Sequence, residues 1–253
     1  MSSEVTCNII VSKIMQDKCA SVIDFFLQPI FNLSTFQCVG AEVLMRGIHR
    51  QQVIAPGVLL PQVGISDSII NIGNHIIREA FHFLRDEILP IKPDFFLCIN
   101  VATHQLNAPE CAEHILNMQK LYSIPVAAII FEITASEEPL TETGEQTVAM
   151  LQTVGFGIAW DDVATVEHVE SKLTQIPGDY IKLDRRCLKL QHVQTTEEVI
   201  YQAQHYGAVV IAEGVETMAQ TSMLLKHNVE LAQGYLFSRP LKKIAFKQQF
   251  IKP

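Results

Sequence analysis

The chain has 253 residues, of which 48% are hydrophobic, and it carries a formal net charge of −8 at pH 7. This length is typical of a single (β/α)₈ barrel and provides enough apolar residues for a large core. The negative charge argues against binding along a nucleic acid polymer, and the absence of a run of about 18 apolar residues argues against a membrane span. We therefore expect one domain over residues 1–253 that contacts neither nucleic acid polymers nor membranes.

The cysteines indicate the redox compartment. Six are spread through the chain without a C-x-x-C pair, at Cys7, Cys19, Cys38, Cys98, Cys111 and Cys187. In a chain of this length such spacing favours reduced, mostly buried thiols over a disulfide framework. We therefore expect a cytoplasmic protein.

Helical periodicity is clearest over residues 66–88, where apolar residues recur at nearly helical spacing: Ile69, Ile72, Ile76, Phe81, Leu84 and Ile88. Two later helices are expected to begin at capping boxes. The first box pairs Thr195 with Glu198, and the second pairs Thr217 with Gln220. Gly207 and Asn228 are the expected stops of these helices.

Six apolar runs each end in a polar or charged group. The groups are Asn100, Glu132, Asp161 with Asp162, Lys182 with Asp184, Glu213 with Glu216, and Gln233. A continuous apolar run is typical of a strand buried on both faces. The groups recur roughly every 20 to 32 residues, about the length of one βα unit, which favours a parallel sheet. Carboxyl ends of parallel strands meet at one rim, where a barrel places its active site.

The oxygen-rich rim predicts a site for Mg²⁺ or Mn²⁺. The adjacent Asp161 and Asp162 suit two cations, and two cations form a clamp for in-line attack on a phosphodiester. Lys182 would orient or deprotonate the attacking water. Ca²⁺ is expected to inhibit because its longer bonds spoil the in-line arrangement. Two simpler interpretations stay open: strand-end carboxylates as helix caps or loop residues, and Glu132 with Lys182 as a structural ion pair.

These residues and further matches over nearly the whole chain resemble the EAL domain family of cyclic di-GMP phosphodiesterases. The naming motif is Glu42-Val43-Leu44 within AEVLMRG, preceded by QPI at 28–30. Other matches are CIN at Asn100, FEIT at Glu132, WDD at Asp161, IKLD at Lys182, AEGVE at Glu213 and QGYLFSRP at 233–240. The resemblance implies an α/β fold, a modified (β/α)₈ TIM barrel with its first strand antiparallel to the rest. It also implies hydrolysis of cyclic di-GMP to linear pGpG.

The resemblance further implies roles for individual residues. The metal ligands would be Glu42, Asn100, Glu132, Asp161, Asp162 and Glu213, holding two Mg²⁺ or Mn²⁺ ions. The catalytic residues would be Lys182, which activates water, and Glu216, which supports the metal shell with Gln233. The ligand contacts would be Gln28, Leu44, Arg46, Gln233 and Pro240.

One segment departs from the family pattern. After the paired aspartates the family has a loop of the type Phe-Gly-Thr-Gly-Tyr-Ser-Ser, whereas residues 163–168 of this chain contain no glycine. A glutamate that braces this loop in the family is replaced by Ala135. Valine and threonine prefer extended backbone, so we expect the loop to take another shape and catalysis to be slow.

Two alternatives to a phosphodiesterase stay open. The altered loop favours a catalytically weak EAL module that senses cyclic di-GMP or regulates a protein partner. The other alternative is an unrelated metal-dependent barrel enzyme. The family's loop takes part in dimer contacts, so a homodimer is a candidate assembly, and a regulatory protein chain is a candidate partner.

Overall fold

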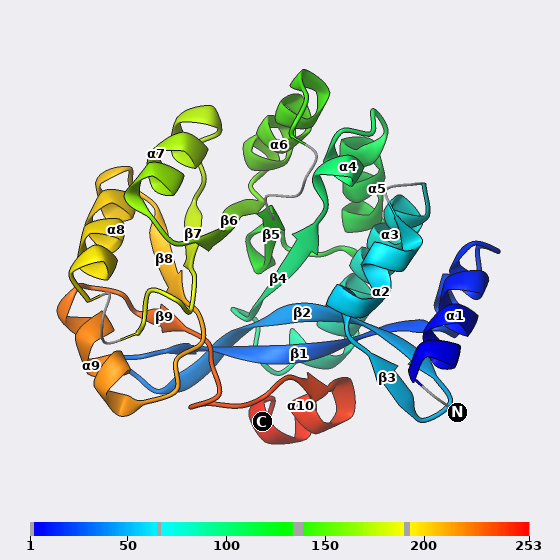
Figure 1. Cartoon of the computed structure of the whole chain (residues 1–253), viewed down its shortest axis with the longest axis horizontal. Coiled ribbons are helices and arrows are strands. Elements are labelled where there is room, and N and C mark those ends of the chain that lie inside the picture. Colours follow the sequence, from blue (N-terminus) through cyan, green and yellow to red (C-terminus); the bar gives the residue numbers. More distant parts are fainter. Residues whose placement is uncertain (1–2, 65–66, 134–138, 190–192, 253) are drawn as a thin grey trace.

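The computed structural model describes residues 3–64, 67–133, 139–189 and 193–252. Within this part, eight strands close into a ring in the order β1, β9, β8, β7, β6, β5, β4, β2 (Figure 1). The strands are β1 Ile23–Asn32, β2 Gln37–His49, β4 Phe96–Val101, β5 Ile129–Ile133, β6 Gly157–Val163, β7 Tyr180–Leu183, β8 Val209–Ala212 and β9 Leu231–Ala232. Strand β1 is antiparallel to both β2 and β9, and the other pairs around the ring are parallel. The predicted barrel with an antiparallel first strand is confirmed.

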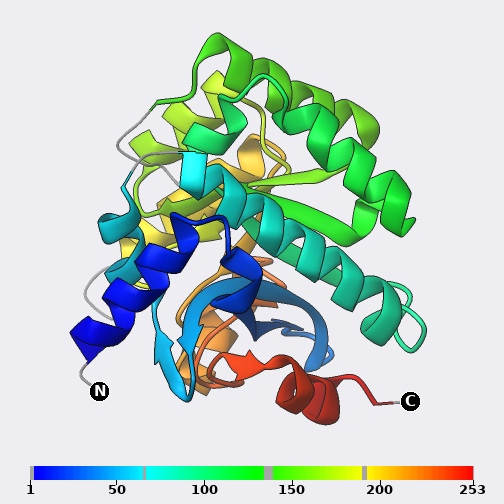
Figure 2. The same cartoon turned by 90° about the vertical axis from the view of Figure 1, so that its right-hand side faces the viewer.

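Helices surround the ring (Figures 1 and 2). They are α1 Ser3–Ile14, α2 Pro56–Val63, α3 Asp67–Phe83, α4 Thr103–Leu106, α5 Cys111–Tyr122, α6 Glu142–Val154, α7 Val166–Gln175, α8 Val193–His205, α9 Met218–Lys226 and α10 Lys243–Phe250. Short helical turns occur at Cys19–Ser21, Leu84–Ile88 and Val126–Ala128, and two short strands, β3 Gln52–Ile54 and β10 Leu241–Lys242, extend the sheet. Helix α10 packs beside β1 on the outside of the ring.

The helix predicted over residues 66–88 is α3, which continues at Leu84 into a π-helical turn. The capping box of Thr217 and Gln220 is confirmed at the start of α9. The box predicted at Thr195 is wrong, because α8 already begins at Val193. A tertiary contact fixes this first turn: the buried Thr196 hydroxyl donates to the carbonyl of Cys187.

Both predicted helix stops are confirmed. Helix α8 ends at His205 and α9 at Lys226, shortly before the stop residues. Gly207 and Asn228 have φ angles of 81° and 56°, so both adopt the left-handed conformation that ends a helix.

Two apolar layers lie on opposite sides of the strands. The larger core packs the outward-facing strand residues against the helices. A smaller cluster fills the inside of the ring and consists of Ile30, Cys98, Ile130, Ala159 and Ile211, with Phe96, Tyr180 and Leu231 against it. All six cysteines are buried and unpaired, as expected from their spacing. No helix among the described residues is long and apolar enough to span a membrane.

Candidate active site

The polar residues of the rim share a strand face with the apolar cluster inside the ring. Side chains alternate along a strand, so residues two positions apart point to the same side. Each step of two residues leads from the apolar cluster to a rim residue: Cys98 to Asn100, Ile130 to Glu132, Ala159 to Asp161, Tyr180 to Lys182, Ile211 to Glu213 and Leu231 to Gln233. The apolar cluster therefore forms a floor, and the polar groups converge above it at the carboxyl ends of the strands.

A bulge in β6 brings two aspartates to this rim. Trp160 pairs with Ile181 and Val163 pairs with Leu183, so Asp161 and Asp162 together face a single residue of β7, Lys182. Asp162 has a φ of 55°, an uncommon left-handed conformation that aspartate tolerates better than most residues. Strand alternation alone would turn the second aspartate away from the first.

Lys182 lies at the centre of the converging carboxylates and is fully buried. Its Nζ atom lies 2.7 Å from Glu213 Oε1, 2.9 Å from Glu132 Oε1 and 3.2 Å from Glu42 Oε2. Asp161 Oδ1 is more distant, at 3.8 Å. One ammonium ion thus contacts four carboxylates that come from four different strands or strand ends.

Two amides connect the carboxylates. The Asn100 Nδ2 atom donates to Glu42 Oε1 at 3.1 Å and to Glu132 Oε2 at 3.0 Å. Gln233 Nε2 donates to Glu42 Oε2 at 2.6 Å and to Glu213 Oε1 at 2.9 Å. Both oxygens of Glu42 are therefore held in place by hydrogen bonds.

Burial and charge act in opposite directions on these groups. Burial raises the pKa of Glu132 and Asp161, and it raises the pKa of Glu213 to about 7, because Lys182 offsets only part of the cost of burial. The pKa of Glu42 is lowered, since Lys182 and the two amides outweigh burial. The carboxylates likewise outweigh the burial of Lys182 and hold its pKa well above the usual range. The full set of ionised carboxylates would therefore carry an excess of negative charge, which either protons or further cations relieve.

We expect metal affinity to fall as the pH falls through 7. Below its pKa of about 7, the Glu213 carboxyl is protonated, and a cation must displace that proton before it can bind. One such proton weakens the apparent affinity about tenfold between pH 8 and pH 6. Calorimetric titration with Mn²⁺ at both pH values, in two buffers of different ionisation enthalpy, measures the affinity and the protons released. An affinity independent of pH, without proton release, would contradict this assignment.

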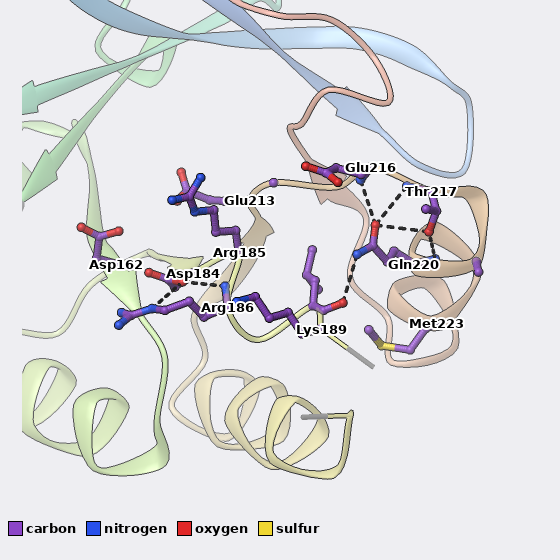
Figure 3. A pocket seen from close by; sticks show the side chains of 13 residues that line it. Asp162, Asp184, Arg185, Arg186, Lys189, Glu213, Glu216, Thr217, Gln220 and Met223 are labelled. Atoms are coloured by element: carbon purple, nitrogen blue, oxygen red, sulfur yellow. Dashed lines mark hydrogen bonds and ion pairs between the residues drawn. The ribbon is translucent and has the colours of Figure 1, made fainter. Parts of the chain in front are cut away.

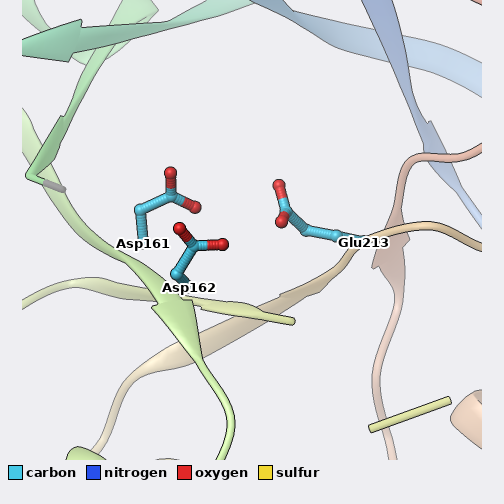
Figure 4. Close-up of side chains that lie close together, drawn as sticks. All are labelled: Asp161, Asp162 and Glu213. Carbon is cyan, nitrogen blue, oxygen red and sulfur yellow. The ribbon is translucent and has the colours of Figure 1, made fainter. Parts of the chain in front are cut away.

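The cluster has the composition and the spare oxygens that a divalent cation needs. One oxygen from each of Asp161, Asp162 and Glu213 lies within 4.8 Å of the others (Figure 4). Among the described residues, Asp161 Oδ1 and Gln233 Oε1 are buried without a hydrogen-bond donor, and Glu132 Oε1 has only its ion-pair contact with Lys182. Buried oxygens without donors are costly in an apolar setting and favourable as ligands of Mg²⁺ or Mn²⁺.

Gly234 makes the position of Gln233 possible. The backbone N–H of Val215 donates to the carbonyl of Gln233 at 3.0 Å, so the two chain segments lie in direct contact. A Cβ atom at Gly234 would lie 2.1 Å from the Val215 carbonyl oxygen and 2.2 Å from its nitrogen. Only glycine permits this approach.

Gly234→Ala is therefore expected to destabilise the fold by about 1–3 kcal/mol, the usual cost of forcing atoms into a packed region. Gly57→Ala is the matched control, because a Cβ at this exposed helical glycine meets nothing within 4 Å. Denaturant unfolding of both variants gives the comparison. Equal midpoints for the two variants would show that the contact with Val215 does not constrain the fold.

The segment after Asp162 contains no glycine and is held by hydrogen bonds to neighbouring segments. No residue from 163 to 168 has a positive φ, and Val163 continues strand β6. The Asp184 N–H donates to the Val163 carbonyl at 2.9 Å, and Cys187 Sγ lies 3.5 Å from the Ala164 carbonyl. Thr165 then caps α7 by accepting from the His168 N–H. The loop takes a short extended shape, as expected, and Ala135 lies outside the described residues.

The remaining predicted site residues lie around this network. Gln28 pairs with Glu42 across β1 and β2, and Leu44 lines an apolar cavity of about 390 Å³ that also reaches Glu42 and Asn100. The guanidinium of Arg46 lies over Phe26 and donates to the Met45 carbonyl. Pro240 is half-buried before β10, and Glu216 is exposed in a second cavity. The geometry thus does not bring Glu216, Arg46 or Pro240 into the Lys182 cluster.

The second cavity contains a residue that sequence reasoning did not single out. Arg186 follows β7 by three residues and lines this cavity together with Asp162 and Glu213. The sequence signal is the pair Arg185-Arg186 directly after the apolar run whose end carries Lys182 and Asp184. Positively charged side chains at the carboxyl-end rim of a barrel are candidates for binding a ligand that is anionic or rich in hydrogen-bond acceptors.

Comparison with known proteins agrees with this arrangement. The family model of the EAL domain matches residues 15–240. The probable cyclic di-GMP phosphodiesterase PdeD of Escherichia coli K12 is 27% identical over 86% of this chain, which spans 41% of that relative. The cyclic di-GMP phosphodiesterase PdeL of the same organism is 26% identical over 89% of this chain and 64% of its own length. The chain therefore spans less than two thirds of these curated relatives.

Solved structures share the fold over nearly the whole chain. The EAL enzyme Bd1971, in its cAMP- and cyclic-di-GMP-bound form, has a TM-score of 0.86 at 24% identity and covers 99% of this chain and 70% of its own. The EAL domain of Mycobacterium smegmatis DcpA has a TM-score of 0.74 at 26% identity, with 90% of this chain and 97% of that chain covered.

Proposed function

The chain belongs to the EAL domain family, and from this premise we propose that it hydrolyses one phosphodiester of cyclic di-GMP to linear pGpG with the help of two divalent cations. The observation that carries the proposal is the position of Lys182. Its ammonium group lies within 4 Å of the carboxylates of Glu42, Glu132, Asp161 and Glu213. A structural ion pair needs one carboxylate, and four around one lysine would repel each other without further cations.

The charges of the cluster support two cations. Five carboxylates, including Asp162, and one ammonium leave a formal charge of minus four, which two divalent ions would neutralise. We propose that Glu42, Asn100, Glu132, Asp161, Asp162 and Glu213 hold Mg²⁺ or Mn²⁺, whose preferred ligands are oxygens. Such ions, when bound, would lower the pKa of water and neutralise charge that develops on the phosphodiester.

The side chains of the protein have separate tasks in this proposal. Lys182 is held between Glu42, Glu132 and Glu213, whose carboxylates account for its three N–H groups. When one of these carboxylates binds a cation, Lys182 would regain one N–H, which would then orient the attacking water. Asn100 and Gln233 fix both oxygens of Glu42. These contacts would fix the positions of the reacting groups before the ligand binds. Much of the rate enhancement of a rigid active site comes from such preorganisation.

The direct test is to incubate the purified protein with cyclic di-GMP and to follow pGpG by chromatography. Product is expected with Mg²⁺ or Mn²⁺, and Ca²⁺ is expected to inhibit because its longer bonds loosen the geometry. Binding of cyclic di-GMP without product in either metal would favour the sensing module that the altered loop suggests. Absence of binding would overturn the proposal.

Three further proposals concern the setting of the reaction. We propose that residues 1–253 act as one EAL-like domain, supported by the closed ring of the described strands. A cytoplasmic location is supported by six buried, unpaired thiols, which suit a reducing compartment. A homodimer or a regulatory protein partner is a prediction that sedimentation analysis, with and without cyclic di-GMP, would test.

A further inference from the structure

A large cavity opens directly beside the acidic cluster (Figure 3). It has a volume of about 1230 Å³ and shares two of its walls, Asp162 and Glu213, with that cluster. The opposite wall is helix α9, with Ala219 and Met223, and the segment after β7 supplies Arg186. A ligand whose phosphodiester lies at the acidic cluster therefore has room to extend one of its halves into this cavity.

Asp184 holds the guanidinium group of Arg186 on one side. Asp184 Oδ1 accepts from the Arg186 backbone N–H at 2.6 Å and from Arg186 Nε at 2.9 Å. Asp184 itself is buried, whereas 63% of the Arg186 side chain is exposed. In the described part of the chain, the Nη1 and Nη2 atoms of Arg186 have no hydrogen-bond partner. Asp184 thus orients the guanidinium through Nε, next to Asp184 and on the Asp162 side of the cavity (Figure 3), and the side chain is otherwise largely exposed.

The lining of the cavity suits a flat heterocycle. Met223 provides partly exposed apolar surface, and Gln220 joins α9 to the segment after β7 by donating to the Leu188 carbonyl at 3.0 Å. The two Nη donors of arginine match the adjacent O6 and N7 acceptors of guanine. Adenine carries an amino donor in place of O6, which would oppose the same donors. The cavity therefore contains, in Arg186, a donor pair that distinguishes the two purines.

We propose that Arg186, oriented by Asp184, binds the O6 and N7 edge of one guanine of the ligand and makes the site select guanine over adenine. This inference rests on the proposed function, because it takes the ligand to be a cyclic dinucleotide. Arg186 contacts the base, whereas Asp184 is a positioning residue that acts through Arg186.

The test compares binding of cyclic di-GMP and cyclic di-AMP by calorimetry in Ca²⁺, together with KM and kcat for cyclic di-GMP in Mg²⁺. Arg186→Gln is expected to weaken cyclic di-GMP binding about 10- to 100-fold and to raise KM, with kcat within about threefold of the wild type. Its affinity for cyclic di-AMP is expected to stay the same, so discrimination between the two is lost. Lys189→Gln, which removes a positive charge from the same cavity, is the matched control and is expected to change little.

Arg186→Lys separates edge recognition from charge. It keeps the positive charge and loses the paired donors, so it is expected to behave like Arg186→Gln. Wild-type affinity in Arg186→Lys would show that charge alone acts, as in binding a phosphate, and would overturn the inference. Unchanged discrimination in Arg186→Gln, in a protein that still binds or hydrolyses cyclic di-GMP, would overturn the inference and leave the proposed function intact. A wild-type protein that binds neither dinucleotide would overturn both. Because Arg186 is exposed, an unchanged unfolding midpoint is expected for every variant.

Discussion

Lys182→Met is expected to lower kcat for cyclic di-GMP by about 10²- to 10³-fold, the range usual for loss of a preorganised hydrogen-bond donor at the reacting atoms. Lys182 Nζ is buried among carboxylates rather than in the ligand cavity, so affinity for cyclic di-GMP in Ca²⁺ should change by only a few fold. Single-turnover kinetics and calorimetry measure these two quantities separately.

The same substitution is expected to destabilise the metal-free protein. Removing the one ammonium ion leaves Glu42, Glu132 and Glu213 buried without a compensating charge, a loss that typically costs about 3–5 kcal/mol. Thermal unfolding in a chelator, and again with Mn²⁺, should show that metal recovers part of the loss.

Lys172→Met is the control for Lys182→Met. Lys172 lies on α7 with its Nζ over the ring of Trp160 at 4.7 Å, outside the carboxylate cluster. Its loss should affect neither kcat nor metal response appreciably. An equal fall in affinity and rate for Lys182→Met would instead make Lys182 a ligand-positioning residue.

Asp161→Asn is expected to abolish measurable turnover and to reduce the stabilisation of the fold by Mn²⁺. Asp161, like Glu213, belongs both to the Lys182 cluster and to the group with Asp162, and its buried Oδ1 has no hydrogen-bond donor among the described residues. We therefore expect Asp161 to serve two cations. A metal at 100 times its Kd stabilises a fold by about 2.7 kcal/mol, and a weakened site loses part of that gain. Thermal unfolding across a Mn²⁺ series measures the difference.

The control for Asp161→Asn applies the same change at the opposite end of the barrel. Asp94 is exposed and lies just before the start of β4, far along the strand from the rim. Asp94→Asn should keep both turnover and the response to Mn²⁺. Full activity in Asp161→Asn would remove the two-metal assignment.

The polar residues of the rim could be predicted because each follows an apolar run that is visible in the sequence. A strand buried on both faces appears in the sequence as an apolar run, and parallel strands must bring their carboxyl ends together. Asn100, Glu132 and Lys182 each follow such a run, and the structure brings all three into one network. Glu42 was found through the family resemblance alone, since it lies inside the long strand β2 and not at the end of a run.

The parts that could not be predicted depend on contacts between distant segments. The bulge at Asp162 arises from the register of β6 against β7, and the approach of Gly234 to Val215 joins two loops. The start of α8 before Thr195 follows from packing against the segment after β7. The orientation of Arg186 is an exception, because it depends on Asp184, only two residues away; the sequence does not show that these two side chains pair.

The structure shows how residues 163–168 connect β6 to α7 without glycine. The left-handed residue beside the rim is Asp162 itself, and the segment after it is held by Asp184 and Cys187. Absence of glycine from residues 163–168 therefore does not prevent an ordered connection to α7. The rate of turnover in Mg²⁺ decides between slow catalysis and the sensing alternative.

Counting the cations bound by the wild-type protein tests the central claim most directly, because the claim is that the carboxylates around Lys182 hold two divalent ions. Native mass spectrometry over a Mn²⁺ titration, in the presence of cyclic di-GMP, gives the number per chain. We expect two Mn²⁺ ions per wild-type chain and at most one in Asp161→Asn. A wild-type chain that binds no Mn²⁺, or the same number as Asp161→Asn, would contradict the two-cation site.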